Sequence, residues 1–339
     1  MENQDAQLFE SLGLQRSSAP TASGSHVNFY HRLPKTLDLS YPILVLIHGY
    51  PQSSYMWRYV VRSLPADIPL FVPDIPGYGL STPSTTGHDK RTTGHAILSA
   101  LSTHLQLSNP LSAPIPIILG GHDRGARICQ RLATDLSIPG PPSAALAAWD
   151  VVGTVILDIM PVTTQWSSLA NPIFARSTFH WPFLANAALA TPMIVAYGGG
   201  KWCQDIILRW ASKGAGLESL RADDALAVYA GYFAKESVVR ASCDDYEAGS
   251  NEDAVMETED QEAGRGIGTD TLLMFSKDYL GSRYDVPTGW KSFVMETADL
   301  KIGGVAGVGH FLPEEAPEEV SEQVALFYQE VVQKIKARG

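Results

Sequence analysis

The chain has 339 residues, of which 45% are hydrophobic and 18% are charged. A chain of this length and composition can bury a large core without help from disulfide bonds or bound metal ions. Its formal net charge of −11 leaves no basic surface on which a nucleic acid or an anionic membrane could bind. We therefore expect neither of these partners.

The cysteines and the N-terminus bear on the cellular compartment. Cys129, Cys203 and Cys243 are widely spaced and form no C-x-x-C pair, which argues against a disulfide framework and against a zinc site. Residues 1–13 carry acidic side chains where a secretory signal would carry basic ones followed by an apolar run. No apolar stretch reaches the roughly 18 residues that a membrane-spanning helix needs. We expect a cytoplasmic protein.

Short apolar runs rich in branched side chains recur along the first half of the chain and predict strands buried on both faces of a sheet. These runs lie at residues 42–48, 68–79, 114–121 and 151–159. Residues 92–107 and 124–136, which separate the later runs, have the apolar spacing of amphipathic helices. Alternating strands and helices predict right-handed crossovers and a mostly parallel sheet with helices on both faces.

The strand pattern disappears after about residue 160 and does not return for roughly a hundred residues. Within this stretch, segments 206–215 and 224–233 carry apolar residues at helical spacing. Many α/β enzymes of this size are one catalytic domain with an inserted lid. We predict a helical cap at residues 161–266.

The last part of the chain returns to the alternating pattern of the first part. Residues 271–275 predict another strand, and residues 318–337 predict a long amphipathic helix that closes the domain. No internal repeat interrupts this organisation. Residues 1–160 and 267–339 are therefore predicted to form one α/β core.

A sharp turn between a strand and a helix is predicted around Asp123. The residues before it form an apolar run that ends in Gly120-Gly121, and a helix pattern starts directly after it. Asp123 lies between Gly121 and Gly125, so the motif reads G-x-D-x-G where the nucleophile elbow of α/β hydrolases reads G-x-S-x-G. The motif predicts an aspartate nucleophile. The alternative is a polar turn in which Asp123 only caps the helix.

Two further motifs have the positions that such an elbow requires. His48-Gly49-Tyr50-Pro51 follows an earlier strand, so the backbone N–H groups of Tyr50 and Arg124 can converge on one oxygen as an oxyanion hole. His310 follows Gly307-Val308-Gly309 near the end of the chain, as the base does in this fold. A lone histidine is more often structural, but the other two motifs favour His310 as the base.

These motifs, together with residues 74–79 and 309–315, resemble those of the haloacetate dehalogenases, including the fluoroacetate-cleaving ones. The resemblance covers almost the whole chain. It implies the α/β-hydrolase fold, an aspartate nucleophile and a homodimer. Related epoxide hydrolases share the elbow and the terminal histidine motif, so these two motifs do not identify the substrate.

The resemblance also implies how the substrate is held. Two arginines of the family bind the substrate carboxylate, and Arg124 and Arg127 match their positions. Three residues apart on a helix, both guanidinium groups would lie on one side, where they could grip a carboxylate. Epoxide hydrolases commonly have an aromatic residue at the position of Arg124. The alternative is that both arginines only form surface salt bridges.

The family's halide pocket consists of a His-Trp pair and a tyrosine in the lid. His180, Trp181 and Tyr246 lie in segments that look like those of the family. Their N–H and O–H groups would stabilise the charge that develops on a departing halide. Taken alone, such residues are more often packed in a core, but their occurrence together with Arg124 and Arg127 reverses that preference.

Two acidic residues compete for the position that orients His310. The haloacetate family has an aspartate after the sixth strand, and Asp158 matches it. Asp278 lies after the seventh strand, the position that epoxide hydrolases use. Asp158 is the first choice, and Asp278 remains an alternative.

The resemblance predicts hydrolytic dehalogenation of a small 2-haloacid through an ester on Asp123, without a cofactor or a metal. The first alternative is epoxide hydrolysis by Asp123 and His310, with a lid tyrosine as proton donor: Tyr229, Tyr232 or Tyr246. The second alternative, from a different class, is a ligand-binding receptor that keeps the fold without turnover. A receptor has no need for an intact set of nucleophile, base and acid.

Overall fold

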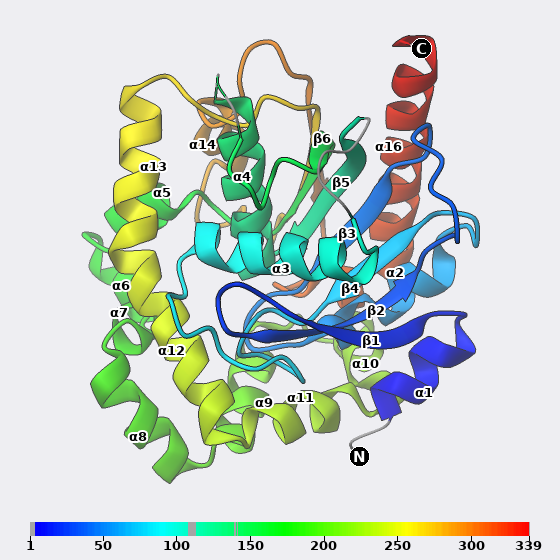
Figure 1. Ribbon diagram of the computed structural model, residues 1–339. Helices are drawn as coiled ribbons and strands as arrows, with labels where there is room; N and C mark the ends of the chain where they lie inside the picture. Colours follow the sequence, from blue (N-terminus) through cyan, green and yellow to red (C-terminus); the bar gives the residue numbers. More distant parts are fainter. Residues whose placement is uncertain (1–3, 108–112, 139, 141, 339) are drawn as a thin grey trace.

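The computed structural model describes residues 4–107, 113–138, 140 and 142–338. These residues form an eight-stranded sheet of order β1-β2-β4-β3-β5-β6-β7-β8 (Figure 1). Strand β2 is antiparallel to both of its neighbours, and all strands from β3 to β8 pair in parallel. The strands are β1 (Gln15–Pro20), β2 (His26–Arg32), β3 (Ile43–Ile47), β4 (Leu70–Pro73), β5 (Ile115–His122), β6 (Trp149–Leu157), β7 (Thr271–Ser276) and β8 (Leu300–Val305).

The predicted mostly parallel sheet is confirmed, with differences at its edges. Strands β1, β2 and β8 were not among the predicted apolar runs, and β1 and β8 are partly exposed along their length. The run predicted at residues 68–79 forms a strand only over Leu70–Pro73. The chain turns after this strand, where Gly77 and Gly79 have φ angles of 87° and 54°.

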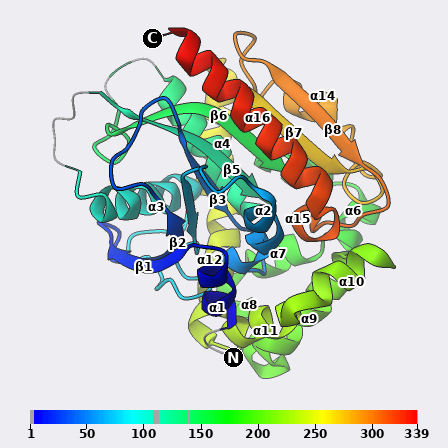
Figure 2. The same cartoon turned by 90° about the vertical axis from the view of Figure 1, so that its right-hand side faces the viewer.

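Helices cover both faces of the sheet, as predicted. Helices α3 (Lys90–His104) and α4 (Arg124–Ser137) lie on one face, and α2 (Arg58–Ser63) and α16 (Pro317–Arg338) lie on the other (Figures 1 and 2). The other core helices are α1 (Gln4–Ser11), η1 (Ser54–Trp57), α14 (Val286–Lys291) and α15 (Leu312–Glu315). Among the described residues, no helix is both long and apolar enough to span a membrane.

The named elements between β6 and β7 are all helices, and they gather on the side of the core where β5 leads into α4 (Figure 1). They are α5 (Val162–Ser168), α6 (Pro172–Ser177), α7 (His180–Leu184), α8 (Ala187–Tyr197), α9 (Gly199–Trp210), α10 (Ala215–Arg221), η2 (Ala222–Asp224), α11 (Ala225–Phe233), α12 (Glu236–Ser250) and α13 (Glu252–Glu262). The predicted limits of the cap, residues 161 and 266, fall just outside α5 and α13. The helix predicted at 206–215 is wrong at its end, because α9 stops at Trp210 and Gly214, with φ 90°, precedes α10.

The turn between β5 and α4 brings backbone segments into direct contact. A Cβ atom on Gly121 would overlap the backbone of Gly125, and a Cβ atom on Gly125 would overlap the carbonyl groups of Ile47 and His48. Both positions therefore accept only glycine without a shift of β3, β5 or α4. This contact is the physical reason for the two glycines of the motif.

We expect Gly125→Ala to lower the free energy of unfolding by about 1–3 kcal/mol, because the added methyl group must displace backbone rather than a flexible side chain. Gly231→Ala is the matched control. Gly231 is exposed in α11, and a methyl group added there would meet open space, so alanine should stabilise the helix by about 0.5–1 kcal/mol. Urea denaturation of both variants measures the difference. Equal stabilities would contradict the proposed overlap.

Candidate active site

Asp123 lies between the end of β5 and the start of α4, with φ 51° and ψ −118°. Its side chain makes no capping hydrogen bond to α4, contrary to the alternative in which Asp123 only caps the helix. The backbone N–H of Tyr50 donates to Oδ1 of Asp123 at 3.0 Å. Oδ2 lies 3.4 Å from Nε2 of His310. The two carboxylate oxygens therefore have different partners.

His310 contacts Asp158 through its other ring nitrogen. Nδ1 of His310 lies 2.8 Å from Oδ2 of Asp158, which is fully buried. The backbone N–H and the hydroxyl of Ser276 both donate to Oδ1 of Asp158, at 2.7 and 2.6 Å. Asp278 is exposed and accepts a hydrogen bond from the N–H of Gly307 at 2.5 Å. The structure brings Asp158, and not Asp278, to the imidazole.

The protonation states of Asp123, His310 and Asp158 depend on one another. Burial would lower the pKa of His310, but the carboxylates of Asp123 and Asp158 raise it to about 9. Burial would likewise raise the pKa of Asp123, but His310, His122 and Arg124 hold it well below its usual range. These shifts favour a protonated His310 beside an ionised Asp123, whereas burial raises the pKa of Asp158 above its usual value.

Two residues that the sequence reasoning did not single out hold His310 in place. Nε2 of His122 donates to the carbonyl oxygen of His310 at 2.7 Å, and burial lowers the pKa of His122 to about 3, so its ring is neutral. The carbonyl oxygen of Trp210, at the end of cap helix α9, accepts the backbone N–H of His310 at 3.0 Å. Core and cap both position the imidazole.

Asp123 and His310 line a small cavity of about 30 Å³ between core and cap. His180 and Trp181, from cap helix α7, lie in its wall, as the halide-pocket expectation requires. The ring of Tyr246 lies 5.9 Å from that of His180 and 5.5 Å from that of Trp181. The three aromatic residues therefore gather next to Asp123.

The donor groups of these aromatic residues are not used elsewhere. Among the described residues, no hydrogen bond engages the Trp181 indole N–H or the Tyr246 hydroxyl, and Nδ1 of His180 is buried without a partner. Burial raises the pKa of Tyr246 well above its usual value, so the hydroxyl keeps its proton. Burial lowers the pKa of His180 to about 3, so that ring is neutral. All three can act as uncharged donors.

Arg124 was expected to bind the substrate carboxylate, but two nitrogens of its guanidinium group already bind a carboxylate of the protein. Nε of Arg124 donates to Oδ2 of Asp245 at 2.8 Å, and Nη2 donates to Oδ1 at 3.0 Å. Although burial opposes the charge, Asp245 raises the pKa of Arg124 above its usual value. Only Nη1 of Arg124 is buried without a partner. A substrate carboxylate could therefore use one donor of Arg124 and not the whole fork.

Arg127 has no carboxylate partner within the described part of the chain. Nη2 donates to the carbonyl oxygen of Met160 at 2.9 Å, while Nε and Nη1 are buried and unpaired. Its guanidinium carbon lies 4.3 Å from the centroid of the Trp181 ring, and that of Arg124 lies 5.6 Å from the same centroid. Burial and the charge of Arg124 lower the pKa of Arg127 to about 10.

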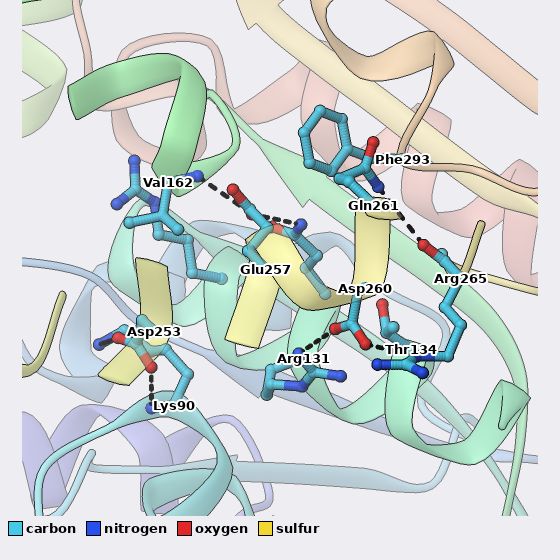
Figure 3. A pocket seen from close by; sticks show the side chains of 13 residues that line it. Lys90, Arg131, Thr134, Val162, Asp253, Glu257, Asp260, Gln261, Arg265 and Phe293 are labelled. Atoms are coloured by element: carbon cyan, nitrogen blue, oxygen red, sulfur yellow. Dashed lines mark hydrogen bonds and ion pairs between the residues drawn. The ribbon is translucent and has the colours of Figure 1, made fainter. Parts of the chain in front are cut away.

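Arg127 also borders a second cavity, of about 30 Å³, which lies between α4 and α13. Figure 3 shows that ion pairs line it: Lys90 contacts Asp253, and Arg131 contacts Asp260. Glu257 accepts hydrogen bonds from Gln130 and from the backbone of Val162 and Thr163 at the start of the cap. The other charged residues of this cavity form ion pairs, but among the described residues neither Arg127 nor Glu257 does, and Glu257 accepts only from uncharged donors.

Three lid tyrosines were considered as proton donors to an epoxide, and for two of them the structure contradicts this role. The hydroxyl of Tyr229 donates to Glu314 at 2.7 Å, and that of Tyr232 donates to Asp5. Both hydroxyls belong to other buried polar clusters. Apolar spacing on a helix cannot distinguish a tyrosine that faces the site from one that faces away. Tyr279, which the sequence reasoning missed, lines the cavity from the core side.

The fold and this arrangement of Asp, His and Asp define an α/β hydrolase. Residues 44–323 match the Alpha/beta hydrolase family, and the chain belongs to that family. It is 25% identical over 282 residues to a fluoroacetate dehalogenase from Burkholderia sp, covering 83% of this chain and 84% of that protein. It is 28% identical over 320 residues to a soluble epoxide hydrolase from Corynebacterium sp. (strain C12), covering 89% and 95%.

Solved structures give the same result for the fold. A candidate epoxide hydrolase from Pseudomonas aeruginosa superposes with a TM-score of 0.76 at 25% identity, over 94% of this chain and 98% of that one. A candidate α/β hydrolase from Nostoc sp PCC 7120 superposes with a TM-score of 0.75 at 26% identity, over 93% and 97%. The chain is therefore a hydrolase with relatives of both predicted activities.

The ion pair between Asp123 and His310 yields a prediction about titration. In Asp123→Asn the carboxylate charge is lost, so the pKa of His310 should fall from about 9 by about 1–3. NMR titration of the imidazole measures this change. Asp278→Asn is the matched control and should leave the titration of His310 unaltered, since Asp278 is exposed and bonded to Gly307. An unchanged pKa in Asp123→Asn would show that Asp123 does not hold the proton on His310.

Proposed function

We propose that this hydrolase removes the halogen from a small 2-haloacid through an ester on Asp123. The observation that carries the proposal is the buried guanidinium of Arg127, which has two unpaired nitrogens and no carboxylate partner among the described residues. A buried charge without a partner is costly, by about 3–5 kcal/mol where measured. An anionic substrate would supply the missing partner, and an uncharged epoxide would not.

The unpaired nitrogens suggest where the substrate carboxylate binds. Nη1 of Arg124 and Nε and Nη1 of Arg127 belong to guanidinium groups that both lie near the Trp181 ring. One carboxylate beside Trp181 could accept from both arginines. A carboxylate bound in this way would hold the carbon that bears the halogen in a fixed direction relative to Asp123. Such orientation of a bound reactant accounts for much of its rate advantage.

In the first step, Oδ2 of Asp123 attacks the carbon that bears the halogen, and the carbon–halogen bond breaks. Oδ1 accepts the N–H of Tyr50 at 3.0 Å and would become the carbonyl oxygen of the ester, whereas Oδ2 has the longer contact, 3.4 Å to Nε2 of His310. The departing halide takes the bonding electrons and moves toward the donors of His180, Trp181 and Tyr246. Donors that are already oriented stabilise this charge without reorganisation.

In the second step, a water molecule gives its proton to His310 and attacks the carbonyl carbon of the ester. Negative charge then develops on Oδ1, which accepts the backbone N–H of Tyr50, and the backbone N–H of Arg124 would complete the oxyanion hole. The tetrahedral intermediate collapses to the Asp123 carboxylate and a 2-hydroxyacid. The balance is one haloacid and one water consumed, and one hydroxyacid, one halide and one proton released.

Epoxide hydrolysis remains the second candidate, because the chain has a soluble epoxide hydrolase among its relatives. Of the lid tyrosines considered, Tyr246 alone keeps a hydroxyl that is not bonded to another cluster of the described residues. A side-by-side assay of fluoroacetate, chloroacetate and styrene oxide separates the two activities. Turnover of styrene oxide without turnover of either haloacid would replace the proposal by epoxide hydrolysis.

If His310 acts only in the second step, His310→Ala should form the ester and then stop. Intact-protein mass spectrometry after incubation with chloroacetate should show a stable adduct, which peptide mapping should assign to Asp123. The double variant with Asp123→Asn in addition is the control and should show no adduct. Absence of the adduct in His310→Ala, with chloroacetate binding demonstrated by calorimetry, would count against this division of roles.

Substitution of Asp158 by asparagine should lower kcat far more than the same substitution of Asp278. Asp158→Asn removes the charge that holds Nδ1 of His310 and should lower kcat by roughly a thousandfold or more. Asp278→Asn changes an exposed residue that contacts only the Gly307 turn, so kcat should stay within about twofold. Steady-state assays on chloroacetate compare the two. The reverse order would make Asp278 the partner of His310.

A further inference from the structure

We propose that Arg283 captures the carboxylate of the haloacid at the outer end of the cavity and thereby determines the preference for anionic substrates. The inference rests on the proposed dehalogenation and assigns a residue outside the elbow, the cap motifs and the Arg124–Arg127 pair. Arg283 belongs to the loop that joins β7 to α14. It is a specificity-determining residue and takes no part in bond making.

Arg283 connects the cavity with solvent. It lines the same cavity as Asp123 and His310, and its side chain is partly exposed. Its guanidinium carbon lies 4.0 Å from the centroid of the Tyr279 ring, and that ring lies 5.3 Å from the ring of His310. A stacked aromatic face restricts the guanidinium without using up its N–H donors. Donors remain for an anion.

Arg283 is also the one permanent cation in the described lining of this cavity. Arg124 and Arg127 are not part of that lining but contact the ring of Trp181, which is, and Asp245 occupies the fork of Arg124. Among the described residues, no carboxylate oxygen lies within 4.0 Å of the nitrogens of Arg283. An arginine that lines a substrate cavity and lacks a carboxylate partner is suited to a carboxylate ligand.

The neighbouring residue fixes this loop against the cap. The hydroxyl of Tyr284 lies 2.8 Å from that of Ser168 in α5, and the Tyr284 ring stacks on Phe174 in α6 at 5.6 Å. Arg283 therefore directly precedes a residue that is fixed to the cap, and its guanidinium stacks on Tyr279. Its position at the cavity does not depend on a freely moving loop.

The charge of the whole protein makes such a residue useful. A net charge of −11 repels an anion at long range, but salt screens that repulsion beyond about 8–10 Å. A local cation can then raise the concentration of the anion where it enters. Arg283 would act on capture, while Arg127 would act on the bound substrate, so the two arginines should affect different kinetic constants.

The test compares Arg283→Met, Arg283→Lys and Arg209→Met on chloroacetate and on the uncharged chloroacetamide, at low and high ionic strength. Arg209 is the matched control: it is an exposed arginine stacked on Phe179 at 5.6 Å and does not line the cavity. We expect Arg283→Met to lower kcat/KM for chloroacetate about tenfold, mainly through KM. Chloroacetamide should change by less than about twofold.

Two further results are expected if Arg283 acts through its charge. Arg283→Lys should recover most of kcat/KM for chloroacetate, and added salt should lower the wild-type value but not that of Arg283→Met. Equal losses on both substrates, or no loss on chloroacetate, overturn the inference while the dehalogenase activity of the wild type stands. A wild type that turns over neither substrate overturns the proposed function, and the inference with it.

Discussion

The site depends on the close approach of α4 to β3 and β5. Because Gly121 and Gly125 have no side chains, the first turn of α4 can lie directly against the carbonyl groups at the end of β3. Asp123 is then forced into a conformation with φ 51°, which raises its carboxylate above the edge of the sheet. The same approach brings the N–H of Tyr50 onto Oδ1. One backbone contact thus positions both the carboxylate and its donor.

A second constraint comes from charges buried between core and cap. Arg124 pairs with Asp245, Lys90 contacts Asp253, and Arg131 pairs with Asp260, each joining a core helix to α12 or α13. Removing one partner of such a pair leaves an uncompensated buried charge. The cap is therefore tied to the helix that follows Asp123. Arg127 breaks this pattern, and its unpaired charge lies next to Trp181 in the cap.

The sequence predicted those parts of the site that lie in continuous motifs. Asp123 and His310 were found because glycines mark the turns that carry them, and β3 to β7 were found because buried parallel strands are continuously apolar. Edge strands such as β1 lack that signal. The partner of His310 was left open between two aspartates, since only the path of the chain decides which one the imidazole meets. Tyr279 and Arg283 belong to no motif, and only the fold brings their loop to Asp123.

The ion pair of Asp123 and His310 determines which of the two proposed steps comes first. While Asp123 is ionised, it keeps His310 protonated, and a protonated imidazole cannot activate water. Alkylation of Asp123 removes that negative charge, so the pKa of His310 falls and the imidazole can lose its proton. Asp158 retains its contact with Nδ1 and keeps the neutral ring basic and oriented. Water is therefore activated only after the ester exists, because the same event that creates the ester releases the base.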